Sequence, residues 1–213
     1  MKKDNYIIPY TIITTVGRLF FHMCYHPTVI GVHHIPLSDA VIFCGNHRHK
    51  LDPACIIYST RRIIHFMAKK EFMNGKDALT AKSNPLLRWL TSLLLKCCGC
   101  ISVDREGSST SALKSALTYL RDGSALGIFP EGMRNKTNDE LLPFKLGAVS
   151  MARKTNAWLV PVGIVGTFSK GGNLTIRFGE PFKIEELSLE EANHELRNKI
   201  LKLIRENENE VPK

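Results

Sequence analysis

The sequence lacks the features of several common protein classes. It contains no internal repeat, no low-complexity segment and no convincing linker, so its 213 residues predict one domain, or one domain with a small appendage. It has no apolar run of about 20 residues, the length that spans a bilayer as a helix. A signal peptide is not expected: Asp4 follows the basic start, Pro9 interrupts the apolar stretch, and no small-x-small cleavage site follows.

The cysteines and histidines lack the spacing of a metal or disulfide framework. Cys97, Cys98 and Cys100 form a cluster, but no second cluster lies at zinc-ribbon spacing. Without a signal peptide, we expect all six cysteines to be reduced in the cytosol. Other possible ligands occur at irregular positions, whereas zinc sites use ordered pairs: His33, His34, His47, His49 and Asp52. We therefore expect no bound metal.

Acidic residues are scarce relative to basic ones. The chain has 29 Lys and Arg against 20 Asp and Glu, a formal net charge of +9 at pH 7. This balance favours an anionic partner, such as nucleic acid, an anionic membrane surface or a phosphorylated substrate, although a soluble protein with a basic surface would look the same. No helix concentrates Lys and Arg on one face and no recognition motif occurs, so we expect no nucleic acid as a partner.

Strand and helix patterns alternate along most of the chain. Bounded apolar runs predict strands at 28–32, 40–44, 63–68, 100–103, 125–129, 158–165 and 174–178. Apolar residues spaced three and four apart, or strongly apolar or charged stretches of helical length, predict helices at 53–60, 85–98, 108–120, 144–156 and 188–207. The alternation predicts an α/β fold with a mixed, largely parallel sheet flanked by helices. Pro161 suggests that its strand lies at an edge or carries a bulge.

The segment 1–27 is predicted to be an amphipathic helical segment in front of an α/β domain at 28–213. Its apolar residues recur at helical spacing, and we expect the helix to start after Pro9. Two interpretations compete. The helix packs on the domain, or it is a membrane-contacting segment that lies in the interface with Arg18 near the head groups. The apolar helix at 85–98, which contains Trp89, also has the composition of a membrane-dipping surface.

The stretch 46–53 carries the strongest chemical signal. It follows an apolar run and Gly45, the pattern of a buried strand that opens into a loop. His47 and Asp52 are separated by four residues, so one tight turn can bring the imidazole and the carboxylate together. In such a pair the carboxylate fixes the imidazole tautomer and leaves the other nitrogen free to take a proton. No serine, threonine or cysteine adjoins the pair, so the nucleophile is expected to belong to the substrate.

Two other predicted strands also end in polar clusters, at 104–105 and at 131–134. Ligands of α/β sheets bind at the carboxyl ends of the strands, so the three clusters are expected to converge on one site. Arg105 and Arg134 suit a phosphate ligand because a guanidinium donates two parallel hydrogen bonds.

Four sequence blocks resemble the glycerolipid acyltransferase family, specifically its bacterial-type 1-acyl-glycerol-3-phosphate acyltransferases. In family order they are Asn-His-x4-Asp at 46–52, Gly-strand-Arg at 99–105, Phe-Pro-Glu-Gly-x-Arg at 129–134 and Val-Pro-Val at 160–162. The resemblance runs from about residue 29 to residue 181. Met133 departs from the family pattern, which has Thr or Ser there, and this leaves the identity of the acceptor open.

The resemblance implies transfer of an acyl group from a thioester, acyl-CoA or acyl-carrier protein, to the free hydroxyl of 1-acyl-glycerol-3-phosphate. His47 would be the general base, since an imidazole pKa of about 6.5 suits proton abstraction near neutral pH. Asp52 would hold the imidazole and stabilise the imidazolium, without an acyl-enzyme or a cofactor. Residues expected to contact the substrate are Asn46, Lys69, Arg105, Glu131, Gly132 and Arg134.

The product of that reaction, phosphatidic acid, is a membrane lipid. A peripheral or monotopic location on the cytoplasmic side of the cell membrane follows from such a function, and the basic charge agrees with it. Acylation of another lyso-lipid or of glycerol-3-phosphate is the nearest alternative. A basic metal-binding or nucleic-acid-binding protein is a more distant one.

Overall fold

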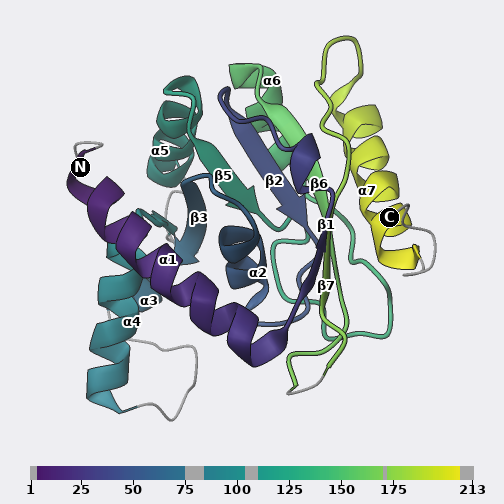
Figure 1. The fold of residues 1–213 in the computed structure, drawn as a ribbon. Coiled ribbons are helices and arrows are strands. Elements are labelled where there is room, and N and C mark those ends of the chain that lie inside the picture. The colour runs from purple at the N-terminus through teal and green to yellow at the C-terminus, as the bar shows by residue number, and fades with distance from the viewer. Residues whose placement is uncertain (1–3, 75–83, 104–109, 170–171, 207–213) are drawn as a thin grey trace.

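The computed structural model describes residues 4–74, 84–103, 110–169 and 172–206 (Figure 1). At its centre is a seven-stranded sheet with the order β1-β7-β6-β2-β5-β3-β4. The strands are β1 (Thr28–Ile30), β2 (Val41–Gly45), β3 (Ile64–Lys69), β4 (Ile101–Val103), β5 (Ala125–Ile128), β6 (Trp158–Val165) and β7 (Thr175–Phe178).

Most of the strand pairs are parallel. β2 pairs in parallel with β5 on one side and with β6 on the other, and β3 pairs in parallel with β5 and β4. β7 is antiparallel to β6, and β1 is parallel to β7. The prediction of a mixed, largely parallel sheet is therefore confirmed.

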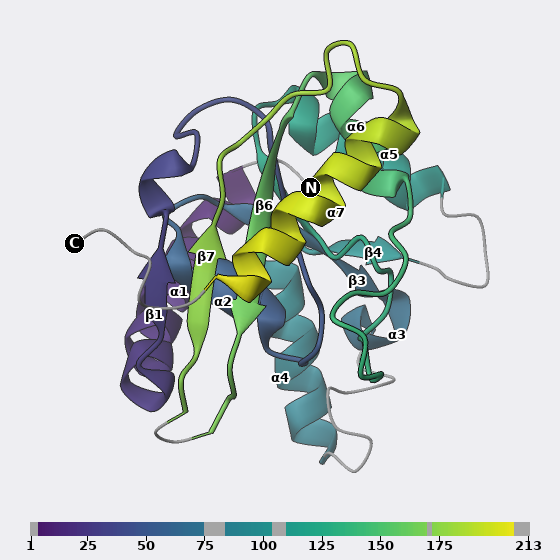
Figure 2. The same cartoon turned by 90° about the vertical axis from the view of Figure 1, so that its right-hand side faces the viewer.

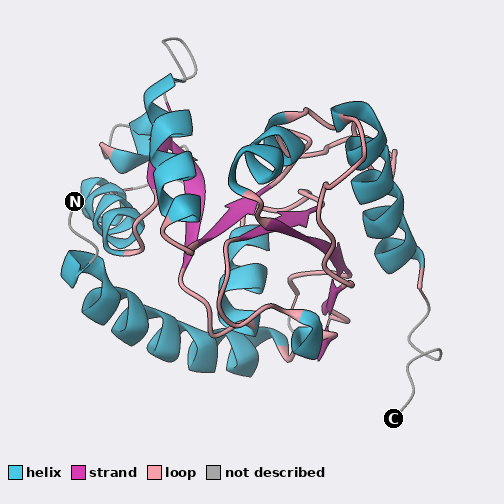
Figure 3. Ribbon diagram, turned by 90° about the horizontal axis from the view of Figure 1, so that it is seen from above, coloured by secondary structure: helices cyan, strands magenta, loops and turns pink. Residues whose placement is uncertain are grey.

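Helices cover both faces of the sheet (Figure 3). They are α1 (Asp4–Tyr25), α2 (Asp52–Ser59), α3 (Lys70–Met73), α4 (Pro85–Cys97), α5 (Thr110–Arg121), α6 (Gly147–Thr155) and α7 (Leu189–Arg205), with a 3-10 turn at Val32–His34. α1 packs on α2 at one face, and α5, α6 and α7 pack at the other, where α7 lies across β6 (Figure 2). Within the described residues, no helix is long and apolar enough to cross a membrane.

Strand β2 is buried on both faces, because helices cover both sides of the sheet. Val41 and Phe43 face the core shared with α2, whereas Ile42 and Cys44 face the core shared with α5 to α7. This alternation explains the unbroken apolar run in the sequence. The polar residues that follow β2, among them His47, therefore begin where the buried strand ends.

The predicted start of the first helix is wrong. α1 begins at Asp4 and contains Pro9, whose ring removes one backbone hydrogen bond without ending the helix. The helix is held instead by its contacts with the domain. Tyr10 is buried, and its hydroxyl accepts a hydrogen bond from the Ile64 N–H at 3.0 Å. A Cβ on Gly17 would lie 2.4 Å from the Tyr58 hydroxyl oxygen, so α1 and α2 approach closely at that point.

Pro161 predicted an edge strand or a bulge, and the edge position is wrong, since β6 lies between β7 and β2. The Pro161 carbonyl accepts a hydrogen bond from Gly179 at 2.9 Å, so this residue faces the β7 side. The ladder between β6 and β7 reaches only to the pair Val162↔Phe178. The missing N–H of Pro161 therefore falls where that ladder ends, and it costs the sheet little.

Candidate active site

The ends of β2 and β5 create the candidate site. The two strands are neighbours, and the register Cys44↔Ile128 brings the residues that follow them side by side. β2 has β5 on one side and β6 on the other. The chain leaves β2 for β3, on the β5 side, and leaves β5 for β6, on the other side of β2, so these two connections run in opposite directions. Such a switch point in a parallel sheet is where ligands of α/β proteins bind.

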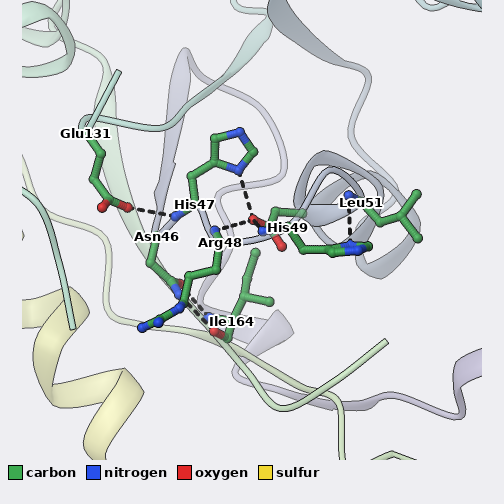
Figure 4. A network of polar contacts seen from close by, with 8 residues as sticks. Asn46, His47, Arg48, His49, Leu51, Glu131 and Ile164 are labelled. Carbon is green, nitrogen blue, oxygen red and sulfur yellow. Dashed lines mark hydrogen bonds and ion pairs between the residues drawn. The ribbon is translucent and has the colours of Figure 1, made fainter. Parts of the chain in front are cut away.

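His47 and Asp52 form the central pair of the site. His47 Nδ1 lies 2.8 Å from Asp52 Oδ2, and the Asp52 side chain is 2% exposed. The same Oδ2 accepts hydrogen bonds from the backbone N–H groups of Arg48 and His49, each at 2.7 Å (Figure 4). Three donors on one oxygen fix the carboxylate, and its position at the start of α2 adds the positive end of the helix dipole.

The other ring nitrogen of His47 is left open. The imidazole stacks on Phe129 with ring centroids 4.1 Å apart, and its side chain is 18% exposed. Because Nδ1 donates to Asp52, Nε2 is the nitrogen that can accept a proton. Across the described ranges, no serine, threonine or cysteine hydrogen-bonds to Nε2. Among the described side chains, none therefore supplies a nucleophile at that nitrogen.

Glu131 fixes the backbone of His47. Its Oε1 accepts from the His47 N–H at 2.7 Å (Figure 4). Its Oε2 accepts from the Leu142 N–H at 2.9 Å. Burial raises the pKa of this carboxyl, and the two N–H groups act in the opposite direction. The sequence predicted Glu131 to contact the substrate. The structure shows both of its oxygens bound to backbone, with the residue 3% exposed.

Asn46 joins β2 to β6. Its side-chain amide donates to the Ile164 carbonyl and accepts from the Ile164 N–H, both at 2.8 Å, and the residue is 2% exposed (Figure 4). The sequence predicted a substrate contact here too. Because both ends of the amide are used within the protein, Asn46 supports the strand end from which His47 projects.

The remaining predicted site residues differ in how they are placed. Gly132 adopts φ 74°, and its N–H donates to the Phe129 carbonyl at 2.9 Å. Arg134 is exposed and precedes Asn135, whose N–H donates to the His47 carbonyl at 2.6 Å. Lys69 ends β3, and neither Lys69 nor Arg134 has an ion-pair partner in the described part of the chain. Arg105 lies outside the described residues.

Lys69 lies at the level of the turn that follows β5. The last β3–β5 pair is Phe66↔Gly127, and β3 continues three residues further, to Lys69. Lys69 also pairs with Val103, directly before the segment that contains Arg105. The structure therefore brings His47, Lys69 and Arg134 to one edge of the sheet.

Two residues of this edge were missed from the sequence. The Arg48 guanidinium donates to the carbonyls of Thr137 and Asp139 and so ties the loop after β5 to the His47 loop. Its position in the sequence between His47 and Asp52 could have marked Arg48 as a residue of the site. Lys145 lies over Gly132. No motif marked Lys145, because only the folded loop brings it back to the turn after β5.

The described residues include no group of three or more His, Cys, Asp or Glu side chains placed to hold a metal ion. His49, one of the possible ligands in the sequence, uses Nδ1 to accept from the Leu51 N–H at 3.3 Å (Figure 4). Its ring stacks on Phe168.

The protein is an α/β protein with a paired imidazole and carboxylate at the carboxyl edge of its sheet. Such a pair can accept a proton from a bound ligand. The family model described as Acyltransferase matches residues 26–165. The chain therefore belongs to the acyltransferase family.

Curated relatives agree with this assignment. The chain is 36% identical over 123 residues to the 1-acyl-sn-glycerol-3-phosphate acyltransferase of Bacillus subtilis, covering 55% of this chain and 54% of that protein. It is 31% identical over 141 residues to the protein of the same name from Borreliella burgdorferi, covering 65% and 51%. The chain thus spans about half the length of these relatives.

A solved structure has the same fold. The crystal structure of the 1-acyl-sn-glycerophosphate (LPA) acyltransferase PlsC from Thermotoga maritima matches 96% of this chain and 81% of its own, with a TM-score of 0.72 and 21% sequence identity.

Proposed function

We propose that the protein is an O-acyltransferase that moves a fatty acyl group from a thioester to the free hydroxyl of 1-acyl-glycerol-3-phosphate. The observation that carries this proposal is the His47–Asp52 pair, held at 2.8 Å, with Nε2 unpartnered among the described residues. Family membership supports the acyl-transfer chemistry, and the names of the curated relatives support the acceptor.

In the proposed reaction, His47 Nε2 takes the proton of the acceptor hydroxyl as its oxygen attacks the thioester carbonyl. The new ester bond forms as the carbon–sulfur bond breaks, and the imidazolium returns its proton to the leaving thiolate. Asp52 stabilises the imidazolium in between. The thioester, acyl-CoA or acyl-carrier protein, is a co-substrate, and the reaction uses no other cofactor.

The surrounding residues position these groups. Asn46 ties the residue before His47 to β6, and Glu131 accepts from the His47 N–H, so we assign both residues positioning roles in place of substrate contacts. The Gly132 N–H already donates to Phe129. We assign stabilisation of the oxyanion to the next two backbone N–H groups, those of Met133 and Arg134, which have no partner within the described residues. Arg134, Lys69 and Arg105 are the proposed phosphate ligands.

The assay that tests this function uses purified protein, acyl-CoA or acyl-carrier protein as donor, and a panel of acceptors. Release of free thiol is expected with lysophosphatidic acid, at a higher kcat/KM than with glycerol-3-phosphate or another lyso-lipid. A preference for one of those acceptors would identify the nearest alternative function, which Met133 keeps open. No thiol release with any acceptor would contradict the proposal.

An exposed apolar surface supports the proposed peripheral location on a membrane, whose cytoplasmic side we propose from the function. α1 turns buried residues such as Tyr10, Thr14 and Phe21 toward the domain, and the Arg18 guanidinium donates to the Thr60 carbonyl. Its outward face is apolar, and six side chains there are at least 60% exposed: Ile8, Ile12, Val16, Leu19, Phe20 and Met23. An apolar face turned away from the protein is typical of a helix that lies in a bilayer interface.

Helix α4 extends this surface. It contacts α1 on the same side of the molecule (Figure 1). Thr91 and Ser92 face inward and are buried, whereas its outward apolar side chains are 40–60% exposed: Leu86, Trp89, Leu90, Leu93 and Leu94. An apolar patch across two neighbouring helices, on a protein of net charge +9, fits an anionic lipid surface.

Charged residues on the outward face of α1 should weaken membrane binding. Replacing Ile12 and Leu19 together with glutamate is expected to lower affinity for anionic phospholipid vesicles at least about ten-fold, because each side chain loses apolar burial worth roughly 1.5–3 kcal/mol. Vesicle co-sedimentation measures this. The matched control places glutamates at Ser111 and Ser115, exposed positions on α5. Equal loss in both variants would point to net charge and contradict a specific membrane face.

A further inference from the structure

Lys145 is an unassigned cation in the turn that follows β5. A Cβ built on Gly132 would lie 2.9 Å from both Cε and Nζ of Lys145, so the end of the lysine side chain rests on the glycine. The Lys145 N–H also donates to the Pro130 carbonyl at 2.9 Å, which ties its backbone to the same turn. Gly132 adopts φ 74°, a backbone conformation that favours glycine, and any side chain there would displace the end of Lys145 from its present position.

The ammonium group of Lys145 has no anionic partner within the described ranges. Its side chain is exposed, and it forms no hydrogen bond or ion pair with a described residue. The oxygens of the buried Glu131 carboxylate are bound instead to the backbone N–H groups of His47 and Leu142. A lysine held against backbone, without a carboxylate, loses side-chain freedom and gains no ion pair in return.

The position of Lys145 relates it to His47. The His47 ring stacks on Phe129, and the Gly132 N–H donates to the Phe129 carbonyl at 2.9 Å. This hydrogen bond closes a tight turn, in which the Cα atoms of Phe129 and Gly132 are less than about 7 Å apart. The imidazole and the ammonium therefore contact the two ends of one turn. α6 begins two residues after Lys145 without a side-chain cap, and its free N–H groups add to the positive potential.

We propose that Lys145 binds a phosphate group of a substrate beside His47. The inference rests on the proposed function, which supplies a phosphate from one of two sources: the acceptor, or the carrier of the acyl donor. An ammonium held at the carboxyl edge of the sheet provides a point charge for such an anion. Gly132 contributes by admitting the lysine and needs no contact of its own with the substrate.

Three variants test Lys145. Lys145→Met removes the charge and keeps the apolar stem, and Lys145→Arg retains the charge. Lys154→Met is the matched control, because Lys154 is exposed near the far end of α6, about 10 Å along the helix axis from the first residue of that helix. Lys145→Met should raise KM for the phosphate-bearing substrate about ten-fold to a hundred-fold with kcat changed less than about three-fold, and Lys145→Arg should recover most of the loss.

Substrates that lack a phosphate group show whether Lys145 binds the phosphate of the acceptor or that of the acyl donor. If KM rises for lysophosphatidic acid but not for monoacylglycerol, Lys145 binds the acceptor phosphate. If it rises for acyl-CoA but not for an acyl-N-acetylcysteamine thioester, Lys145 binds the phosphates of the donor. An unchanged KM for every substrate, or an equal rise with substrates that lack phosphate, would overturn the proposal.

Calorimetry with glycerol-3-phosphate and with coenzyme A separates this proposal from the proposed function, because it needs no turnover. Weaker binding of either ligand to Lys145→Met supports the phosphate site even if the wild-type protein transfers no acyl group. Binding of both ligands unchanged from wild type would count against the site even in an active enzyme.

Discussion

Replacement of His47 by alanine is expected to lower kcat for acyl transfer by on the order of 10³-fold. The reason is that Nε2 is the base in the proposed reaction, and the residue that orients it, Asp52, cannot replace it while buried and bonded to backbone. Thiol release from acyl-CoA with lysophosphatidic acid as acceptor measures the effect. His194→Ala, at an exposed position of α7, should leave the rate unchanged.

Loss of folding must be separated from loss of the base. The His47 ring stacks on Phe129 and bonds to Asp52, so alanine removes about 1–2 kcal/mol of stability, a fall of roughly 2–8 °C in Tm. His47→Asn keeps an N–H donor near Asp52 but has no basic nitrogen. It should therefore fold with a smaller change in Tm and be as inactive as the alanine variant. Turnover within ten-fold of wild type in either variant would refute the role of His47.

Replacement of Asp52 by asparagine is expected to lower kcat by on the order of 10²–10⁴-fold, with KM changed less than about three-fold. Oδ2 accepts three hydrogen bonds, and an amide oxygen can take its place toward the two backbone N–H groups of Arg48 and His49. The negative charge that stabilises the imidazolium is then missing. The substitution should therefore lower kcat and leave KM nearly unchanged, because Asp52 is buried away from the substrates.

Two comparisons sharpen the Asp52 experiment. Asp39→Asn is the matched control, since Asp39 is exposed and precedes β2 at the opposite end of that strand. Asp52→Ala should lower Tm more than Asp52→Asn, because alanine leaves three donors without an acceptor. An Asp52→Asn variant with wild-type kcat would show that the imidazole needs no carboxylate partner.

Much of the fold could be predicted from local patterns. Every predicted strand has a counterpart in the sheet, because buried strands must be apolar on both faces and end at glycine, proline or polar residues. The errors arose where tertiary contacts outweigh local preference. α1 continues through Pro9 because its buried face docks on the domain, and β6 tolerates Pro161 because the adjoining ladder ends there.

The helical spacing of α1 was visible in the sequence, but which face is buried was not. The two competing interpretations of this helix are compatible in the structure. One face packs on the domain, and the opposite face, with Ile12 and Leu19, remains exposed. Membrane contact by that face remains a prediction that the vesicle experiment tests.

The sequence by itself determined the fold class, the family resemblance and the pairing of His47 with Asp52. The two residues are five positions apart, so the local turn between them brings their side chains together. Only the tertiary structure decided what Asn46, Glu131 and Lys145 contact. Their partners are set by strand register and loop return: Asn46 bonds to a residue 118 positions away, and Glu131 to one 84 positions away. Such contacts leave no local pattern, because the sequence near each residue carries no information about which strand lies beside it.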